Sequence, residues 1–427
     1  MNEYFIEGGA PVSGTIRASG NKNAALPCIA AALLTDEPLI LRNIPDIEDV
    51  QVMLDVYRSL GGVVERLGPN GYKMTLQNIT SSEVPLEHSK KIRASILFAG
   101  PLLARTGTAI LPPPGGDVIG RRRLDTHFLA LTELGAAVEM NGAFVFTSPR
   151  LRGADIFLDE ASVTATENAV MAAVLAEGET VLTNVASEPH VQDLCRMLVS
   201  MGAKIEGIGS NILRIRGVKK LAGCDFSIGA DFMEVGSFIG LAAATRSELC
   251  IEGPSLSDLR PTKIAFSKLG ICWEHEGTTL RVPKNQDMKV NCDIGGMIPK
   301  IDDSPWPGFP PDLMSIIVVV ATQVEGTVLV HEKMFESRMF FVDKVIGMGA
   351  RIVLCDPHRA VISGPTRLTA SELTSPDVRA GMAMVIAAMC AEGKSIIRNV
   401  YQIERGYENL VARLSSLGAR ITRGKDC

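Results

Sequence analysis

Hydrophobic residues follow the same order along this chain six times. In each copy a segment with apolar residues at helical spacing ends in leucine or methionine followed by glycine, and a segment rich in β-branched residues begins. The six junctions are Leu60-Gly61, Leu134-Gly135, Met201-Gly202, Leu269-Gly270, Met348-Gly349 and Leu417-Gly418, so successive glycines lie 74, 67, 68, 79 and 69 residues apart. Glycine just past the last periodic residue is typical of a helix C-terminus. The pattern predicts six junctions between a helix and a strand.

Alanine-rich apolar segments form a second set of six, and we predict that they are helices. They occupy residues 24–34, 95–104, 169–176, 235–244, 314–324 and 380–391. A short strand follows each segment, and further strands follow each glycine junction. The chain is therefore predicted to use one mixed α/β unit six times.

The ends of the chain indicate how the six units divide. Residues 2–19 read as two strands with no helix before them, and the last unit stops soon after Ile421, where further strands are expected. We predict that the N-terminal strands complete the last unit. The six units then form two domains, residues 22–229 and residues 1–21 plus 230–427. A single elongated solenoid is the alternative, although these units exceed the usual solenoid periods.

Composition narrows the class of protein. A chain of 427 residues is too long for one core, and 46% hydrophobic with 21% charged residues is typical of globular proteins. No apolar run approaches the roughly 18 residues that span a bilayer, and the N-terminus does not resemble a signal peptide. The nine cysteines include no C-x-x-C pair, and the net charge of −5 argues against a general nucleic-acid binder. We expect a cytoplasmic protein without disulfides, metal or organic cofactor.

The loop at residues 114–123 has the composition of a binding loop. Glycines flank Asp117, and three arginines follow at 121–123. Such a loop is suited to present a carboxyl group and cations to an anionic ligand, whereas a solvated surface loop is the simpler alternative.

Basic residues mark the starts of three alanine-rich helices, at Lys22, Arg93 and Arg379. A cation there opposes the helix dipole, so a bound anion is expected to compensate it. Asp312 opens another of these helices after Pro310 and Pro311, where it is equally explicable as an N-cap.

Six stretches of this sequence together resemble the enolpyruvyl transferase family. They are residues 20–27 (GNKNAALP), 114–120 (PGGDVIG), 162–168 (SVTATEN), 309–312 (FPPD), 335–338 (FESR) and 403–408 (IERGYE). The resemblance covers the whole chain in order. It implies a two-domain inside-out α/β barrel in which each domain contains three βαβαββ repeats with pseudo-threefold symmetry. The branch acting on shikimate phosphate would instead begin with a Gly-Ser-Lys-Ser type of phrase, where this chain has Gly20-Asn21-Lys22-Asn23.

The resemblance also implies a reaction and a set of site residues. The reaction transfers the enolpyruvyl group of phosphoenolpyruvate to the 3-hydroxyl of UDP-N-acetylglucosamine and releases phosphate, as the first committed step of peptidoglycan synthesis. It needs no cofactor and can be carried out by a monomer. The implied catalytic residues are Asp117, Lys22, Asp312 and Arg405, with Asp312 as the base. The implied substrate-binding residues are Asn23, Arg93, Arg122, Asp125, His127, Ser162, Val163, Thr164, Glu336, Arg338, Asp377 and Arg379.

Several residues depart from the family pattern. Most members carry cysteine, the target of the epoxide antibiotic fosfomycin, where this chain has Asp117; a carboxylic acid with a raised pKa can still donate a proton. Thr164 replaces a glycine, Glu160 lies near where some relatives place a lysine, and Arg123 stands where proline is usual. These changes leave two alternatives open, namely a related transferase for another nucleotide or sugar, and a non-catalytic or RNA-binding relative.

Overall fold

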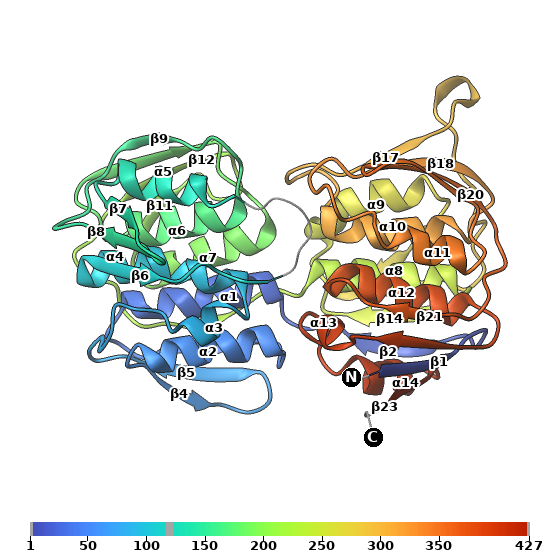
Figure 1. Ribbon diagram of the computed structural model, residues 1–427, viewed down its shortest axis with the longest axis horizontal. Helices are drawn as coiled ribbons and strands as arrows, with labels where there is room; N and C mark the ends of the chain where they lie inside the picture. The colour runs from blue at the N-terminus through green and yellow to red at the C-terminus, as the bar shows by residue number, and fades with distance from the viewer. Residues whose placement is uncertain (1–2, 117–122, 425–427) are drawn as a thin grey trace. The chain divides into compact units, whose positions relative to one another are not determined.

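The computed structural model describes residues 3–116 and 123–424 of the chain (Figure 1). These residues form two compact units. One contains residues 20–116 and 123–229 and is called here the 20–229 unit. The other contains residues 3–19 and 230–424 and is called the 230–424 unit. Each unit is described by itself.

The described strands of the 20–229 unit form three sheets, in the orders β13-β3-β5-β4, β6-β8-β7 and β11-β12-β10-β9. Within the four-stranded sheets, β3 and β10 pair in parallel with β13 and β9, and antiparallel with β5 and β12. One residue in two is buried along β10, as in a strand with one face against a core. The strands are β3 (Leu39–Arg42), β4 (Val63–Arg66), β5 (Gly71–Thr75), β6 (Thr108–Leu111), β7 (Ala137–Met140), β8 (Phe144–Thr147), β9 (Asp155–Phe157), β10 (Glu179–Thr183), β11 (Lys204–Glu206), β12 (Ile212–Arg216) and β13 (Asp225–Ser227).

The 230–424 unit repeats this arrangement in the orders β15-β16-β14-β2, β17-β18-β20-β19 and β21-β22-β1-β23. The N-terminal strand β1 lies between β22 and β23, whereas β2 pairs in parallel with β14. The prediction that both N-terminal strands complete the last repeat is therefore wrong for β2, which completes the fourth. The strands are β1 (Glu3–Glu7), β2 (Ser13–Arg17), β14 (Glu248–Glu252), β15 (Glu274–Glu276), β16 (Thr279–Val282), β17 (Lys300–Asp302), β18 (Gly326–His331), β19 (Ile352–Asp356), β20 (Arg359–Gly364), β21 (Glu372–Thr374), β22 (Lys394–Arg398) and β23 (Arg420–Gly424).

The alanine-rich segments are helices at the centre of each unit. In the 230–424 unit α8 (Phe232–Ala244) and α10 (Met314–Ala321) are buried along their whole length, and both contact α12 (Val378–Cys390). In the 20–229 unit α1 (Lys22–Ala31) contacts the 3₁₀ helix η2 (Arg93–Phe98), which continues into α4 (Ala99–Thr106) and contacts α6 (Val163–Ala173). A helix that is apolar on all sides must be buried. Figure 1 shows these helices between the sheets of each unit, which confirms the predicted inside-out α/β architecture.

The six predicted helix-to-strand junctions are all present. The helices that end at them are α2 (Glu48–Ser59), α5 (Asp125–Glu133), α7 (Pro189–Ser200), α9 (Arg260–Ser267), α11 (Val342–Gly347) and α14 (Leu410–Ser416). The junction glycines all have positive φ, between 71° at Gly270 and 105° at Gly61, which side chains other than glycine rarely adopt. The shorter helices are η1 (Ala32–Leu34), α3 (Leu86–Ser89), η3 (Leu256–Leu259), η4 (Ile294–Gly296), η5 (Pro311–Leu313) and α13 (Tyr401–Glu404).

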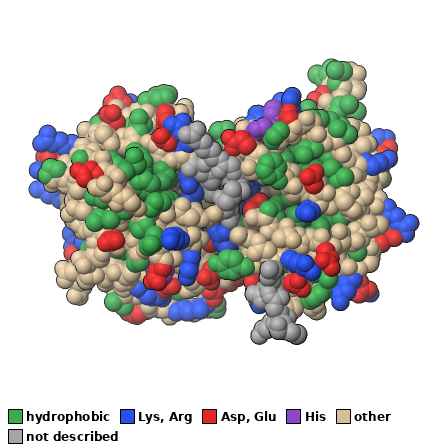
Figure 2. All heavy atoms as spheres, in the orientation of Figure 1, with side chains coloured by type: hydrophobic (Ala, Val, Ile, Leu, Met, Phe, Trp, Pro, Cys, Tyr) green, Lys and Arg blue, Asp and Glu red, His purple; other side chains and the backbone are tan. Residues whose placement is uncertain are grey.

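The surface and the thiols are consistent with the composition. On the face drawn in Figure 2, Lys and Arg side chains are interspersed with Asp and Glu. Of the helices formed by the described residues, none has the length and apolar character to cross a membrane. The eight described cysteines are free.

Candidate functional site

The predicted site residues fall into two groups, one in each unit. Asp117 and Arg122 lie outside the described residues. The others lie at helix starts, in the turn after β18 or in the segment that follows α13.

Lys22 is the first residue of α1 and is largely buried. Its Nζ lies 2.5 Å from Asp49 Oδ2, and the two side chains are 12% and 4% exposed. Asn21 caps the helix, since its Oδ1 accepts hydrogen bonds from Asn23 N at 2.8 Å and Ala24 N at 3.3 Å. The expected cation at a helix start is therefore present, and it is already held by one carboxylate.

Arg93 opens η2 and faces the end of the predicted binding loop. Its Nη2 donates to the main-chain oxygen of Arg123 at 3.1 Å. Arg123 in turn pairs with Asp125, 3.0 Å away, and both of these side chains are about half exposed. Asp125 therefore contacts a neighbouring arginine at the surface, at the start of α5.

The start of α6 offers main-chain N–H groups. Ser162 is the N-cap residue, but its side chain makes no capping hydrogen bond within the described chain. The first N–H groups of a helix have no partner inside the helix, and the positive end of its dipole attracts anions. Ser162, Val163 and Thr164 are all partly exposed here. The start of α6 therefore presents main-chain N–H groups beside three partly exposed residues.

His127 is buried behind that helix start, and its hydrogen bonds fix its tautomer. Nδ1 lies 2.9 Å from Asn168 Nδ2, and Nε2 lies 3.0 Å from Thr164 Oγ1. The Asn168 amide nitrogen also donates to Ile96 O, while its oxygen accepts from Gly100 N. Nδ1 of His127 is therefore an acceptor, and Nε2 carries the proton that is donated to Thr164.

The histidine stays neutral in the folded protein. Burial, with a smaller contribution from the nearby Arg93 charge, lowers the pKa of His127 to about 3. Because the Thr164 hydroxyl accepts from the imidazole, its own proton is left to donate to an acceptor at the α6 start. The residue that replaces the family's glycine thus presents an oriented hydroxyl group.

Asp312 is the centre of the group in the 230–424 unit. Its Oδ1 accepts from Arg338 Nη2 at 2.8 Å, and its Oδ2 accepts from Arg379 Nε at 3.1 Å. The two arginines are each 4% exposed, while the Asp312 side chain is 22% exposed. The N-cap interpretation of Asp312 is wrong, because Leu313 precedes α10 and the carboxylate binds guanidinium groups instead.

Arg379 has further partners that hold it in place. Its guanidinium lies over the Tyr407 ring, with 5.3 Å from Cζ to the ring centroid, and its Nη2 lies 3.9 Å from Asp231 Oδ2. Its Nη1 is buried and makes no hydrogen bond within residues 3–116 and 123–424. A buried N–H donor without a partner is costly, so this nitrogen is ready for a ligand oxygen.

The other predicted residues of this unit have different settings. Asp377 caps α12, since its Oδ1 accepts from Arg379 N at 2.8 Å and Ala380 N at 2.9 Å. Arg405 is 5% exposed and donates to Gln402 Oε1 at 2.7 Å. Glu336 is exposed in the turn after β18. The structure thus joins Asp312, Arg338, Arg379 and Asp377 in one cluster.

Sequence reasoning missed the partners of these residues. They are Asp49 beside Lys22, Asn168 beside His127, and Asp231 and Tyr407 beside Arg379. Asp231 had a usable signal, because it begins an alanine-rich helix as Asn21 does and caps it through Met233 N and Glu234 N. Asn168 and Tyr407 lie within two of the six stretches that carry the family resemblance, residues 162–168 and 403–408, whereas Asp49 lies in α2 with no distinguishing pattern.

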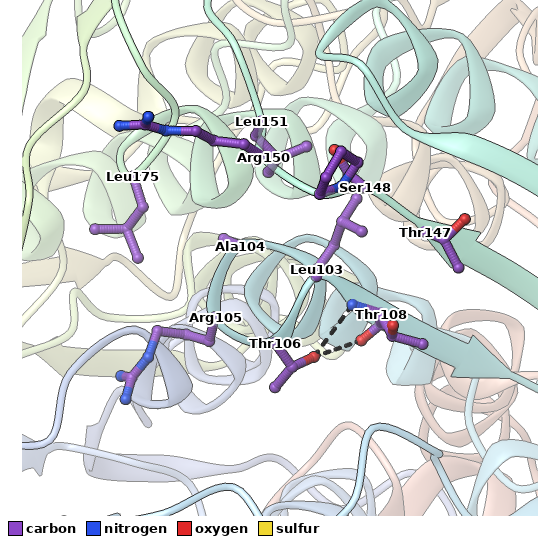
Figure 3. Close-up of a pocket in the computed structure, with 12 residues that line it drawn as sticks. Leu103, Ala104, Arg105, Thr106, Thr108, Thr147, Ser148, Arg150, Leu151 and Leu175 are labelled. Carbon is purple, nitrogen blue, oxygen red and sulfur yellow. Dashed lines mark hydrogen bonds between the residues drawn. The ribbon is translucent and has the colours of Figure 1, made fainter.

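A surface pocket lies elsewhere in the 20–229 unit. It has a volume of about 610 Å³ and is lined by the end of α4, the start of β6 and the segment 147–151 (Figure 3). Of the site residues that the structure describes, none lines it. Its Thr106 hydroxyl bonds to main-chain atoms of Leu102 and Thr108. In the described part of the chain, no group of three or more His, Cys, Asp or Glu residues could hold a metal ion.

Comparison with known proteins identifies the class. The family model of EPSP synthase (3-phosphoshikimate 1-carboxyvinyltransferase) matches residues 6–414, so the chain belongs to this family of enolpyruvyl transferases. Among its relatives, a protein of Treponema denticola named UDP-N-acetylglucosamine 1-carboxyvinyltransferase is 71% identical over 421 residues and 99% of each chain. A protein of Borreliella burgdorferi with the same name is 59% identical over 426 residues and 100% of each chain.

Solved structures show the same fold. The enolpyruvyl transferase NikO from Streptomyces tendae aligns with a TM-score of 0.89 at 23% identity, over 100% of this chain and 99% of that one. EPSP synthase from Acinetobacter baumannii aligns with a TM-score of 0.76 at 16% identity, over 100% of both chains. The resemblance inferred from the six stretches is confirmed.

Proposed function

We propose that this chain transfers the enolpyruvyl group of phosphoenolpyruvate to the 3-hydroxyl of UDP-N-acetylglucosamine and releases phosphate. The observation that carries the proposal is the cluster of Arg338, Asp312 and Arg379, in a chain that is similar over its full length to proteins bearing that enzyme's name. The same proposal assigns the chain to peptidoglycan synthesis as a cytoplasmic monomer.

The reaction needs cations for the phosphate and the carboxylate of phosphoenolpyruvate. We assign this role to Lys22, Arg93, Arg122, Arg379 and Arg405, of which Arg122 rests on sequence alone. Arginine binds an oxyanion through two parallel N–H groups, whereas lysine acts as a point charge. The buried Nη1 of Arg379, which has no partner in the described chain, supports this assignment. Asn23 and Asp377 complete the assignment at the starts of α1 and α12.

Asp312 is the proposed base. Each of its oxygens accepts a hydrogen bond from a guanidinium group. A substrate carboxylate that binds Arg379 would compete for that guanidinium and release Asp312 Oδ2. The freed oxygen could then accept the proton of the sugar hydroxyl as that hydroxyl attacks the substrate.

Asp117 is the proposed acid, from its position in the sequence. It would give its proton to the methylene carbon of phosphoenolpyruvate while the sugar hydroxyl adds to the neighbouring carbon, which yields a tetrahedral intermediate. Loss of phosphate, together with one proton from the new methyl group, then forms the enolpyruvyl ether. A carboxylic acid performs the first step only if its pKa is raised enough to keep the proton.

The nucleotide is proposed to bind at the starts of α5 and α6. Asp125, His127, Ser162, Val163 and Thr164 are assigned to it, and Glu336 and Arg338 to the sugar side of the site. The uncapped N–H groups of α6 suit a diphosphate. The hydroxyl of Thr164, absent from the family pattern, favours one alternative, a related transferase that takes a different nucleotide or sugar.

Release of phosphate from phosphoenolpyruvate tests the proposal. The protein is assayed with UDP-N-acetylglucosamine, with UMP and with other nucleotide sugars, and product is identified by mass. Turnover that requires UDP-N-acetylglucosamine supports the proposal. Turnover with only another acceptor supports the alternative. If no acceptor leads to release of phosphate, both are rejected.

A further inference from the structure

Two buried carboxyl groups lie behind the Asp312 cluster and take no part in the proposed reaction. Asp303 directly follows β17 and Glu332 directly follows β18. These strands are parallel neighbours whose last paired residues are Asp302 and His331 (Figure 1). Asp303 and Glu332 are the next residues of the two strands, and their carboxyl groups lie within hydrogen-bonding reach of each other. Both residues are 0% exposed.

In each carboxyl group one oxygen accepts hydrogen bonds from main-chain N–H groups, and the other oxygen is bare, with no hydrogen-bond partner in the described chain. Glu332 Oε1 accepts from Met334 N at 3.2 Å and Phe335 N at 3.1 Å, and Asp303 Oδ1 accepts from Lys333 N at 2.6 Å. Glu332 Oε2 and Asp303 Oδ2 are buried without a hydrogen-bond partner among the residues that the structure describes. Two bare carboxylate oxygens are costly in a dry interior, and one proton held between them would satisfy both.

The charges around this pair cannot neutralise two carboxylates. The nearest cation is Arg338, whose Nε lies 3.8 Å from Glu332 Oε2 and whose guanidinium also binds Asp312. The side chain of Lys333 turns to Asp302, 2.9 Å away, where Lys300 also pairs.

His358 is a further titratable neighbour of the pair, beside His331, which directly precedes Glu332. It meets Glu332 through main-chain groups, since its Nδ1 lies 2.8 Å from Glu332 O and its main-chain oxygen accepts from Glu332 N. It therefore adds no direct contact to the bare oxygens, and the Arg338 guanidinium is shared between Glu332 and Asp312.

We propose that Asp303 and Glu332 form an acid pair that holds a single proton and acts as a positioning element for Asp312, through Arg338. While the proton is present, the pair carries one negative charge and Arg338 keeps its 2.8 Å hydrogen bond to Asp312. When the proton leaves to solvent, a second buried negative charge next to Arg338 competes with Asp312 for the guanidinium. The inference rests on the role of Asp312 proposed above.

The pair is expected to lose its proton at a pH above neutral. Burial, and next the hydrogen bond that protonated Glu332 makes with Asp303, raises the pKa of Glu332 to about 9. The proton is therefore held at neutral pH. Each pH unit above that pKa lowers the fraction of pairs that keep it about tenfold.

The variants Glu332→Gln and Asp303→Asn test the proposal, because each amide imitates the protonated acid and cannot lose its proton. In the native protein kcat is expected to fall about tenfold per pH unit above about pH 9. In both variants kcat is expected to stay within about threefold of the native value near neutral pH and to lose that alkaline decline. Asp302→Asn, one residue away and paired with surface lysines, should keep the native profile. An alkaline decline that is unchanged in both amide variants overturns the proposal.

An infrared measurement makes the test independent of activity. The native protein should show the carbonyl band of a protonated carboxylic acid at neutral pH that disappears near pH 9 and is missing in both variants. Because the native band needs no variant, the test stands even if an amide variant does not fold. Absence of a band that titrates there overturns the proposal. A titrating band in a protein that does not transfer enolpyruvyl groups would reject the proposed function and keep the acid pair.

Discussion

The two units of this chain hold their charged residues in different ways. In the 20–229 unit each cation has a separate small set of partners: Lys22 pairs with Asp49, and Arg93 bonds to a main-chain oxygen. In the 230–424 unit two arginines that are 4% exposed share one carboxylate, Asp312, and lie next to a further buried pair of acids. The first arrangement holds its cations in separate contacts and leaves the start of α6 partly exposed, and the second fixes a carboxylate in a network.

This difference suggests a division of roles. Cations and free N–H groups at helix starts bind phosphate groups, which arrive with their own charge. A carboxylate held by two buried guanidinium groups has a fixed direction before any substrate binds, and such preorganisation is what a reacting group needs. We therefore expect changes in the 230–424 cluster to affect turnover most, and changes in the 20–229 unit to affect binding and stability.

The largest effect is expected for Asp312→Asn. The amide has nearly the shape of the carboxylate but cannot accept the hydroxyl proton, so kcat should fall by about 10²–10⁴-fold. The KM for phosphoenolpyruvate should change far less, because the arginines remain. Steady-state kinetics measures both, and circular dichroism checks that the variant is folded. A near-normal turnover would show that the cluster serves structure alone and would remove the proposed division of roles.

The next effect concerns Asp117, which belongs to the loop at residues 114–123. Most family members carry cysteine there, whose thiolate opens the epoxide of fosfomycin; a carboxylic acid is a much weaker nucleophile. The native protein should keep its activity in fosfomycin, whereas Asp117→Cys should lose activity with time and gain the mass of the antibiotic on this loop. Inactivation of the native protein, with mass added at Asp117, would contradict this prediction.

The fold could be predicted further than the site. The six glycine junctions and the alanine-rich helices repeat locally in the sequence, and both depend on short-range rules of helix ends and apolar composition. The pairing of β2 with β14 was missed because any strand that follows β1 could join either neighbouring repeat. Which sheet it joins is decided by contacts between residues more than 200 positions apart, such as Thr15 with Cys250.

The candidate site residues could be proposed from the sequence where they stand at helix starts, but their partners could not. Lys22 and Arg379 could be found because a cation at a helix N-terminus is unusual. The choice between cap and functional carboxylate for Asp312 stayed open in the sequence, since its partner Arg379 is 67 residues away. Asp49 and Glu332 have no local signal, because their environments exist only after the repeats have packed. Asn168 ends the stretch at 162–168, but nothing in that stretch indicates its partner His127.

A smaller effect is expected from the buried histidine of the 20–229 unit. Folded His127 titrates at a pKa of about 3, whereas an unfolded histidine titrates near 6.5. Between these values the unfolded chain binds more protons, so the free energy of unfolding should fall as the pH falls, by up to about 1.4 kcal/mol per pH unit. Urea unfolding at a series of pH values measures this slope.

The matched variants are His127→Gln and His275→Gln. The first should flatten the acid slope, because it removes the group that must stay neutral. The second replaces a histidine exposed in β15 and should leave the slope unchanged. Equal slopes in all three proteins would mean that other groups cause the loss of stability in acid.

The smallest effect compares the caps of two equivalent helices. Asn21 caps α1 through the N–H groups of Asn23 and Ala24, and Asp231 caps α8 through those of Met233 and Glu234. Asn21→Ala should lower the free energy of unfolding by about 1 kcal/mol, and Asn21→Asp, which keeps the acceptor oxygen, should lower it less. Asp231→Ala should cost more, because it also removes a carboxylate 3.9 Å from Arg379. Urea unfolding ranks the three; equal losses for both alanine variants would mean that Asp231 acts only as a cap and that Asp312 alone balances Arg379.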